Sequence, residues 1–84
     1  EDGEIARIAV ESDFRRNGVA SRLLKELAFI CADNGVNKLL LDVRESNESA
    51  KAFYKKKGFL LDGVRKNYYT NPTENAILMS LELV

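Results

Sequence analysis

The sequence contains no histidine and only one cysteine, Cys31, among its 84 residues. A single cysteine excludes an internal disulfide and is typical of a reducing compartment, so we expect a cytoplasmic protein. Zinc and iron sites depend on histidine and cysteine ligands, and we therefore expect no metal site. Cys31 falls within an apolar pattern, where core packing is favoured over reactivity.

Long hydrophobic runs and an excess of one charge are missing as well. A membrane-spanning helix needs about 20 consecutive apolar residues, and no signal-peptide pattern opens the chain. The 13 basic and 13 acidic residues balance, so the overall charge does not indicate binding to nucleic acid or to membranes. The chain begins at Glu1 and reaches strand-like sequence almost at once, and we expect it to be a processed product or a fragment.

The residues that are present indicate one small soluble domain, with 45% apolar and 31% charged side chains. Apolar residues recur every three or four positions between residues 19 and 31, which predicts an amphipathic helix. Asn34-Gly35 is typical of the end of such a helix. Ser46-Asn47 supplies an N-cap for a second helix, which stops at Gly58.

The remaining apolar segments have the length and composition of strands. The predicted order is strand 4–10, helix 18–34, strand 38–43, helix 47–57, strand 59–65 and strand 76–83, with a polar loop at 67–75. Two strand–helix–strand crossovers favour right-handed connections and parallel pairing of the first strands, and the last two strands can pair antiparallel. We therefore expect an α/β fold with a mixed sheet. At least one sheet edge stays open, and an edge beside apolar surface favours a partner.

Residues 14–24, FRRNGVASRLL, place two arginines and a glycine at the start of the first predicted helix. The first amides of a helix have no partners within it, and the helix dipole adds partial positive charge, so such a start can bind phosphate. Gly18 has no Cβ and would let a diphosphate approach the backbone. A tight turn capped by Asn17 explains the same residues, and the spacing alone favours that simpler interpretation.

Several motifs resemble one family in their order and spacing. Arg15-x-x-Gly18-x-Ala20, after a strand and before a helix, resembles the acetyl-CoA signature of the GNAT superfamily of N-acetyltransferases. The segments IAVESDFRRNGVASRLL, LLLDVRESNESAKAFYKKKGF, VRKNYY and NAILMSLEL resemble the bacterial ribosomal-protein-alanine N-acetyltransferases over nearly the whole chain. This resemblance implies the C-terminal portion of a GNAT fold, in a single domain that lacks the first strands and helices.

The resemblance places acetyl-CoA, used as a substrate, at three points of the chain. The backbone of Ile8, Ala9 and Val10 would pair with the pantetheine arm as another strand would. Asn47 would hydrogen-bond the pantetheine side of the cofactor, although it needs no ligand to serve as a helix cap and can do both. The pyrophosphate would lie against the loop and the helix start, residues Arg15, Arg16, Asn17, Gly18, Val19, Ala20 and Ser21.

Tyr54 matches the family's general acid. Acyl transfer from a thioester expels a thiolate, which a nearby phenol can protonate. An unperturbed tyrosine has a pKa of about 10 and keeps its proton at neutral pH. Tyr54 also lies in helical register with Ala50 and beside Phe53, and the spacing alone favours an ordinary core aromatic.

Asp42 is the next-to-last residue of the apolar segment KLLLDV, residues 38–43. Strand alternation predicts Leu40 and Asp42 on one face of the sheet and residues 39, 41 and 43 on the other. A carboxylate in such a segment must be paired or hydrated, and an ion pair with Arg44 or Arg65 would account for it. The resemblance implies instead a base that deprotonates the incoming amine. The family has glutamate here, and the shorter Asp42 would reach the amine through a water.

Two polar segments have weaker implications. Lys55 to Lys57 form a basic patch, which favours a solvated helix face over attraction of the cofactor's 3′-phosphate or of an acidic partner. Tyr68 and Tyr69 lie in a segment that resembles the family's substrate-contacting loop, with ordinary loop packing as the alternative.

As a whole, the resemblance implies an enzyme that transfers an acetyl group from acetyl-CoA to the N-terminal α-amine of a protein, with a ribosomal protein as one candidate acceptor. Because the part of the family fold that would wall the acceptor site is not in this sequence, a CoA-binding or interaction module without turnover is the alternative. A homo-oligomer or a swapped assembly could cover the open sheet.

Overall fold

The structure of the protein, a computed structural model, describes residues 4–8 and 17–83. Its elements follow the predicted order: β1 (Glu4–Ile8), α1 (Asn17–Asp33), β2 (Val36–Arg44), α2 (Glu48–Lys56), β3 (Leu60–Tyr69) and β4 (Glu74–Glu82). β3 continues to Tyr69 rather than ending at Arg65. Asn67 adopts a positive φ of 54° there, a conformation that asparagine tolerates, and the pairing shifts register instead of stopping.

The strands form one sheet in the order β1-β2-β4-β3. β1 and β2 are parallel, and β3 and β4 are antiparallel, as predicted. β4 also pairs antiparallel with β2, so it lies between β2 and β3. β2 and β3, the strands joined by the second crossover, therefore run in the same direction but do not pair with each other, whereas parallel pairing was expected. A strand that returns from a hairpin can bond along both of its edges, and this position satisfies both.

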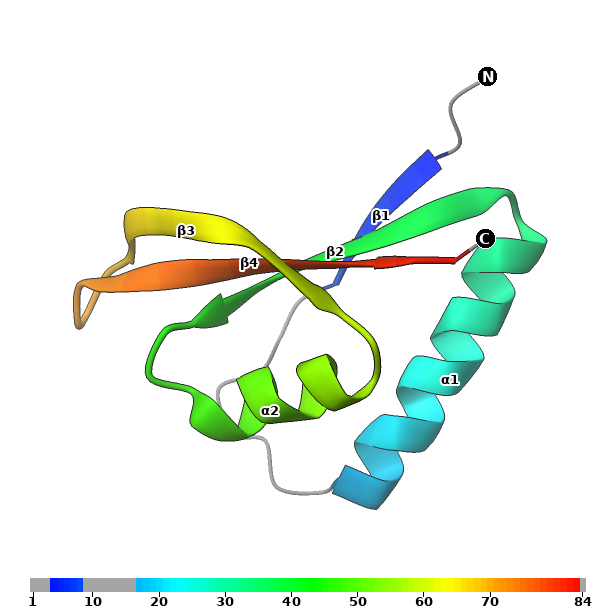
Figure 1. Cartoon of the computed structure of the whole chain (residues 1–84), viewed down its shortest axis with the longest axis horizontal. Coiled ribbons are helices and arrows are strands. Elements are labelled where there is room, and N and C mark those ends of the chain that lie inside the picture. Colours follow the sequence, from blue (N-terminus) through cyan, green and yellow to red (C-terminus); the bar gives the residue numbers. More distant parts are fainter. Residues whose placement is uncertain (1–3, 9–16, 84) are drawn as a thin grey trace.

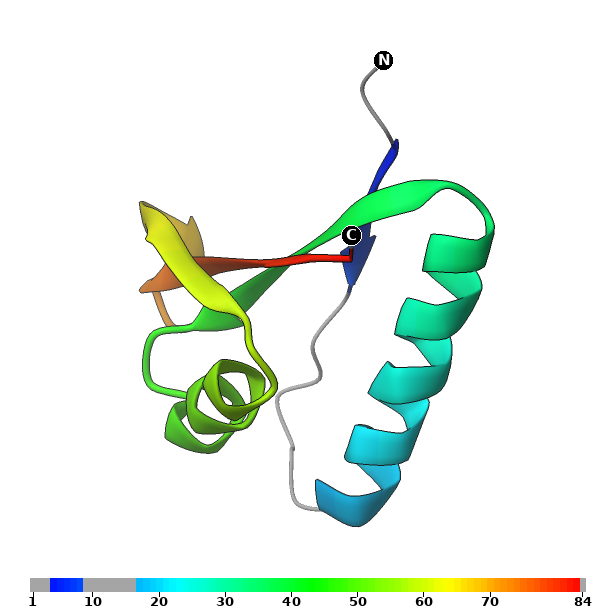
Figure 2. The same ribbon diagram turned by 45° about the vertical axis from the view of Figure 1, so that its right-hand side comes forward.

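Both helices cover the same face of the sheet, with α1 on the β1 side and α2 on the β3 side (Figures 1 and 2). Cys31 of α1 packs against the core that they enclose, as predicted. The buried members of this core come from alternate positions of β2 and β4, from α2 and from the residue before β3: Leu39, Leu41, Val43, Ala50, Phe53, Tyr54, Phe59, Ile77 and Met79.

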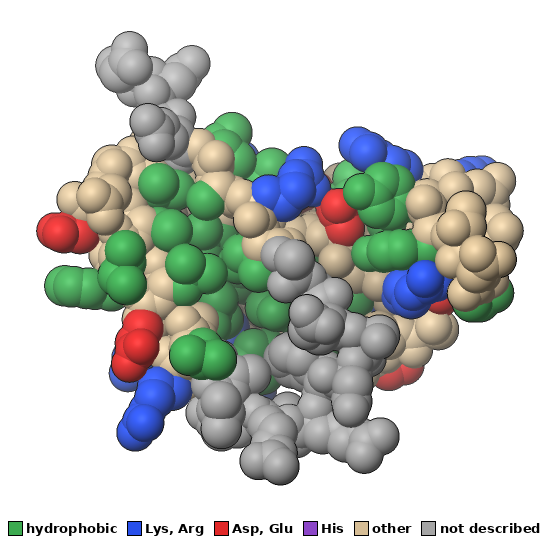
Figure 3. All heavy atoms as spheres, turned by 180° about the vertical axis from the view of Figure 1, so that it is seen from behind, with side chains coloured by type: hydrophobic (Ala, Val, Ile, Leu, Met, Phe, Trp, Pro, Cys, Tyr) green, Lys and Arg blue, Asp and Glu red, His purple; other side chains and the backbone are tan. Residues whose placement is uncertain are grey.

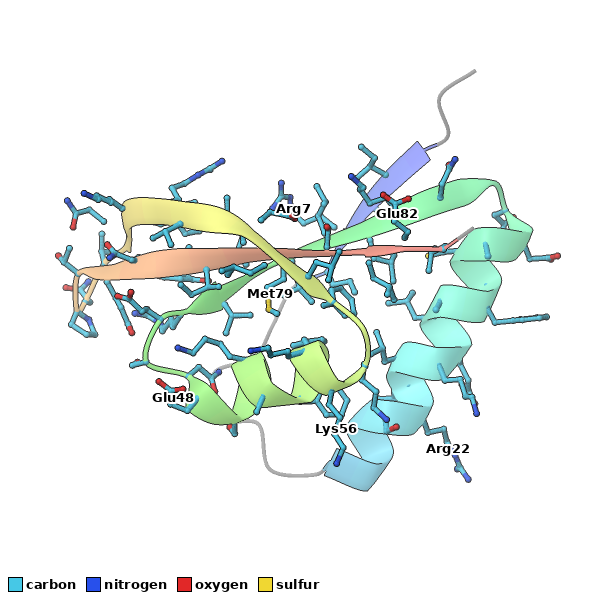
Figure 4. All side chains as sticks on the ribbon, viewed as in Figure 1. Arg7, Arg22, Glu48, Lys56, Met79 and Glu82 are labelled. Atoms are coloured by element: carbon cyan, nitrogen blue, oxygen red, sulfur yellow. The ribbon has the colours of Figure 1, made fainter. Side chains whose placement is uncertain are left out.

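The opposite face of the sheet, called the open face below, carries charged side chains. None of the described helices lies over it (Figures 1 and 2). In Figure 4, Arg7 and Glu82 project away from the helices, whereas Met79 points toward α2. Three ion pairs connect neighbouring strands on this face: Arg7–Asp42 at 3.0 Å, Arg44–Glu74 at 3.1 Å and Lys38–Glu82 at 3.6 Å.

The described part of the chain also exposes apolar surface. α1 exposes Leu23, Leu27, Phe29 and Ile30, and hydrophobic side chains gather on the α1 side of the molecule when it is seen from behind (Figure 3). β1 and β3 are the two outer strands of the described sheet, so the predicted open edges are present. Within residues 4–8 and 17–83, no helix combines the length and the apolar character that crossing a membrane requires.

The alternation of buried and exposed leucines gives a test of the fold. Leu41 is 1% exposed and Leu60 is 67% exposed. We expect Leu41→Ala to lower the free energy of unfolding by roughly 2–5 kcal/mol, because it removes buried methyl groups and leaves a cavity. The matched control, Leu60→Ala, should cost no more than about 0.5 kcal/mol. Urea unfolding followed by circular dichroism measures both, and equal losses would contradict the assignment of the buried face.

Candidate functional site

The parallel pair β1–β2 stops where β1 ends. Ile8 pairs with Leu41, and β2 then continues through Asp42, Val43 and Arg44 with no described strand beside it on that side. In open α/β sheets, ligands bind beyond the carboxyl ends of parallel strands, where the backbone is not fully paired. Ile8 is half-buried at this point. The carboxyl end of β1 is therefore the candidate ligand site, and the positions of the predicted site residues are described relative to it below.

Asp42 lies on the open face, as the alternation predicts, and its partner is Arg7. Nη1 of Arg7 donates hydrogen bonds to both carboxylate oxygens, at 3.0 and 3.1 Å. The expected pairing with Arg44 or Arg65 is wrong, because Arg44 pairs with Glu74 and the Arg65 guanidinium lies 5.2 Å from the Tyr68 ring centroid. The side chain of Asp42 is 13% exposed against 57% for that of Arg7. Asp42 is thus a nearly covered carboxylate next to an accessible cation.

Tyr54 lies on the other side of β2, in the core. It is buried between Phe53 and Phe59, whose ring centroids lie 5.1 and 5.2 Å from its own in edge-to-face geometry. This confirms the packing predicted from the helical spacing with Ala50 and Phe53. Burial raises the pKa of Tyr54 above 10.0, so the phenol keeps its proton at neutral pH. The two predicted catalytic residues therefore lie on opposite sides of the sheet, Asp42 on the open face and Tyr54 in the core.

Asn47 caps α2, as predicted. Its Oδ1 accepts hydrogen bonds from the Ala50 amide at 3.2 Å and from the Ser49 hydroxyl at 3.3 Å. Cap formation uses the carboxamide oxygen, and no described residue accepts a hydrogen bond from the carboxamide nitrogen. The cap therefore fixes the orientation of a donor next to the carboxyl end of β2.

The predicted phosphate-binding residues are only partly described. α1 begins at Asn17, one residue before the predicted start, so Asn17, Gly18, Val19 and Ala20 form its first turn. The amides of a first turn have no partners within the helix and lie at the positive end of its dipole. Ser21 follows, half-buried. Ala9, Val10, Arg15 and Arg16 lie outside the described residues.

A second group of residues on the open face was not predicted as part of a site. Glu74, at the start of β4, accepts hydrogen bonds from the backbone amide of Ser46 and from Arg44. The hydrogen bond from Ser46 holds the pKa of Glu74 below its ordinary value. No local spacing reveals this contact, because it depends on β4 pairing with β2, and only the alternation along β4 places Glu74 on the face of Arg44.

Comparison with known proteins identifies the family. The sequence profile of the Acetyltransferase (GNAT) family matches residues 1–59 of the chain. The chain belongs to the GNAT family. A relative from Escherichia coli (strain K12), named [Ribosomal protein bS18]-alanine N-acetyltransferase, is 38% identical over 85 residues, which are 99% of this chain and 57% of the relative.

Solved GNAT structures share the fold. The crystal structure of Ard1 from Thermoplasma volcanium has a TM-score of 0.84 and 33% identity, and the match covers 96% of this chain and 56% of that one. A GNAT acetyltransferase from Elizabethkingia anophelis, solved with acetyl-CoA bound, has a TM-score of 0.79 and 25% identity over 96% of this chain and 62% of that one. The chain spans about half the length of the curated relatives that it matches, 52–57% for the first of them.

The basic patch of this GNAT chain is exposed. Lys55, Lys56 and Lys57 all reach solvent, and Lys57 lies 5.6 Å from the Phe53 ring centroid. Lys55 also lines a groove of about 530 Å³ between α2 and the β3–β4 hairpin. Asp42 and Tyr54 do not line this groove. The exposure of all three lysines agrees with the favoured interpretation of a solvated helix face.

The contact of Glu74 with Ser46 predicts a pH dependence of stability. Because the pKa of Glu74 is lower in the folded protein, its contribution is present above the unfolded value, near 4.5, and is lost as pH falls through the folded pKa. We expect Glu74→Gln to reduce the melting temperature near pH 7, and the difference from wild type to shrink below pH 4.5. Thermal melts from pH 7 to pH 3 measure this, with exposed Glu48→Gln as the control. A difference that stays constant with pH would contradict the assignment.

Proposed function

We propose that the protein transfers an acetyl group from acetyl-CoA to the N-terminal α-amine of a protein by direct attack, without an acyl-enzyme. The observation that best supports the proposal is that Asp42 follows the last β2 residue paired with β1, on the open face, while Tyr54 is buried in the core on the other side of the sheet. Membership of the GNAT family and the names of the relatives support the same class of reaction.

The described residues have the chemistry that the cofactor needs. The first-turn amides of α1, from Asn17 to Ala20, suit a pyrophosphate because they are unpaired donors at a positive helix end. The carboxamide nitrogen of Asn47 is a donor suited to the amide carbonyls of pantetheine, and the backbone of Ile8 offers a strand edge. These residues would hold the cofactor, together with Ala9, Val10, Arg15, Arg16 and Ser21.

Acetyl-CoA supplies an activated thioester, whose carbonyl carbon forms a bond with the amine while the carbon–sulfur bond breaks. Tyr54 donates its phenolic proton to the sulfur, which burial favours by keeping the phenol protonated. Asp42 receives the proton that the amine loses, through a water that spans the missing methylene. Arg7 occupies one side of the carboxylate, which has further lone pairs for that water.

The demand on Asp42 is modest for this acceptor. A protein α-amine has a pKa of about 8, against about 10.4 for lysine, so at pH 7 about a tenth of it already lacks the extra proton, a fraction roughly 200-fold larger than for lysine. An α-amine therefore needs less help from a base than a lysine side chain does. The acceptor that we propose is a protein N-terminus that begins with alanine, as in the name of the Escherichia coli relative, [Ribosomal protein bS18]-alanine N-acetyltransferase.

A CoA-binding or interaction module without turnover is the second candidate. The chain spans about half the length of its curated relatives, and no described helix covers the open face beside Asp42. Release of free thiol from acetyl-CoA in the presence of an alanine-starting peptide distinguishes the two candidates. Cofactor binding without thiol release would favour the module.

Tyr54→Phe tests the acid. The variant keeps the ring contacts with Phe53 and Phe59 and removes only the proton donor. We expect kcat to fall roughly 100-fold or more, with the affinity for acetyl-CoA unchanged. Thiol release gives kcat, and calorimetry gives the affinity. A variant with wild-type kcat would exclude Tyr54 as the acid.

Gly18→Val tests the pyrophosphate site. A β-branched side chain in the first turn of α1 would obstruct the approach of a diphosphate, and we expect CoA to bind roughly tenfold more weakly or worse, through the loss of charge-assisted hydrogen bonds. Gly63→Val on β3 is the matched control, because a Cβ at Gly63 meets no atom within 4 Å. Calorimetry with CoA measures both variants. Equal affinities for CoA would reject this start of α1 as the pyrophosphate site.

A further inference from the structure

Arg44 is the most extensively bonded side chain of the open face. Its Nη1 donates to Glu74 Oε1 at 3.1 Å and to the carbonyl oxygen of Pro72 at 3.4 Å, and its Nη2 donates to the carbonyl oxygen of Thr70 at 3.4 Å. The guanidinium carbon also lies 4.3 Å from the Tyr69 ring centroid. The planar fork of arginine allows one side chain to make all of these contacts at once.

All of these partners belong to residues 69–74, which are the turn that connects β3 to β4 together with the last residue of β3 and the first residue of β4. Arg44 therefore fastens this turn, called the hairpin turn below, to the carboxyl end of β2. Glu74 extends the connection by accepting a hydrogen bond from the Ser46 amide, and Asn75 adds another by donating to Glu45 at 3.2 Å. The hairpin turn is thereby held against the segment that leads from Asp42 to Asn47.

Tyr69 is the residue of the hairpin turn that connects it to the surroundings of Asp42, the candidate base. It is half-buried, and its register with Glu74 places it on the open face. Burial raises the pKa of Tyr69 first, and the negative charge of Asp42 raises it further, whereas Arg44 lowers it. The Tyr69 ring lies 4.3 Å from the guanidinium carbon of Arg44, which is two residues beyond Asp42 on the same face of β2, so the phenol and the carboxylate share one part of the open face.

We infer that Arg44 is a positioning residue for the acceptor, which holds the hairpin turn and Tyr69 at a fixed distance from Asp42. The inference rests on the proposed function, in which the acceptor amine approaches Asp42 from the open face. In this inference the peptide lies across the open face between Asp42 and the hairpin turn, and its binding depends on where that turn lies. Most of the proposed cofactor residues lie elsewhere, at the start of α1 and along β1, and Asn47 is held by its own hydrogen bonds from Ala50 and Ser49.

The other end of β2 supplies a comparison on the same face. Lys38 pairs with Glu82 at 3.6 Å, and their side chains are 38% and 62% exposed, against 29% and 16% for Arg44 and Glu74. An exposed pair of this kind adds little to stability. Lys38 is thus a matched control, a basic residue of the same strand and face that is paired across to the same neighbouring strand.

Steady-state kinetics of the full protein with acetyl-CoA and an alanine-starting peptide test the inference. We expect Arg44→Met to raise KM for the peptide roughly tenfold, because small displacements of a positioning group have large effects. KM for acetyl-CoA should change by less than about twofold, since the cofactor contacts remain. Lys38→Met should leave both values at the wild-type level.

Two further measurements separate positioning from general stability. Arg44→Lys keeps the charge but lacks the planar fork, and it should raise KM for the peptide above the wild-type value by less than Arg44→Met does. The lysine variant keeps the test possible if the methionine variant folds poorly. Hydrogen exchange should accelerate at the amides of the hairpin turn in Arg44→Lys while the amides of α2 keep their rates.

The outcomes distinguish the inference from the proposed function. Equal rises of both KM values in the arginine variants would show a general loss of structure and overturn the positioning role. Turnover by the wild-type protein, combined with an unchanged KM for the peptide in the arginine variants, would overturn the positioning role and leave the proposed function standing. A wild-type protein that binds acetyl-CoA but releases no thiol would overturn the proposed function, and this inference with it.

Discussion

Strand geometry sends successive side chains of β2 to opposite faces of the sheet, and the rest of the structure is arranged around this alternation. Leu39, Leu41 and Val43 are buried under the helices, and each such side chain contributes roughly 1.5–3 kcal/mol through its burial. The ion pairs on the other face contribute about 0–1 kcal/mol each where they are exposed. Burial of one face therefore sets the register, because a slip of one residue would place Asp42 and Arg44 in the core. The open face is left free to carry polar chemistry.

Local patterns predicted the elements and the face of each β2 residue, and they failed where a contact depends on strand order. Arg7 and Asp42 are 35 positions apart in the sequence, and only the parallel register of β1 with β2 brings them together. The predicted partner Arg44 shares the face of Asp42, but residues two apart on a strand are separated by about 6.6 Å along it. Both observed pairs join diagonal neighbours on adjacent strands, because Arg7 is in register with Leu40 and Arg44 with Ala76. Diagonal neighbours are within reach of long side chains. Arg44 is bonded to Glu74, and Arg7 is the partner of Asp42.

The same distinction divides the candidate site. The Asn47 cap depends on neighbours within one helix, and Tyr54 is on the apolar face of that helix, so both the cap and the packing of Tyr54 were predicted from spacing. The role of Glu74 was not predictable, because it follows from β4 lying between β2 and β3. Sequence order favours pairing β2 with β3 after the crossover, and nothing in the spacing indicates that the hairpin returns into that gap. The functional roles of all the site residues stay predictions, and Ala9, Val10, Arg15 and Arg16 lie outside the described residues.

The proposed reaction needs a group that holds a proton and another that lacks one, and β2 keeps them in different environments. Tyr54 lies among aromatic rings, where burial raises its pKa and preserves its proton. Asp42 lies on the charged face, where Arg7 balances its charge. If the two were in contact, the phenol would donate to the carboxylate by hydrogen bonding and neither would be directed at the substrate. The backbone of β2 and the side chains beneath it prevent this contact. In the proposed reaction the thioester would lie along the unpaired edge of β2 beyond Leu41, where β1 ends, with its sulfur toward Tyr54 and the attacking amine toward Asp42.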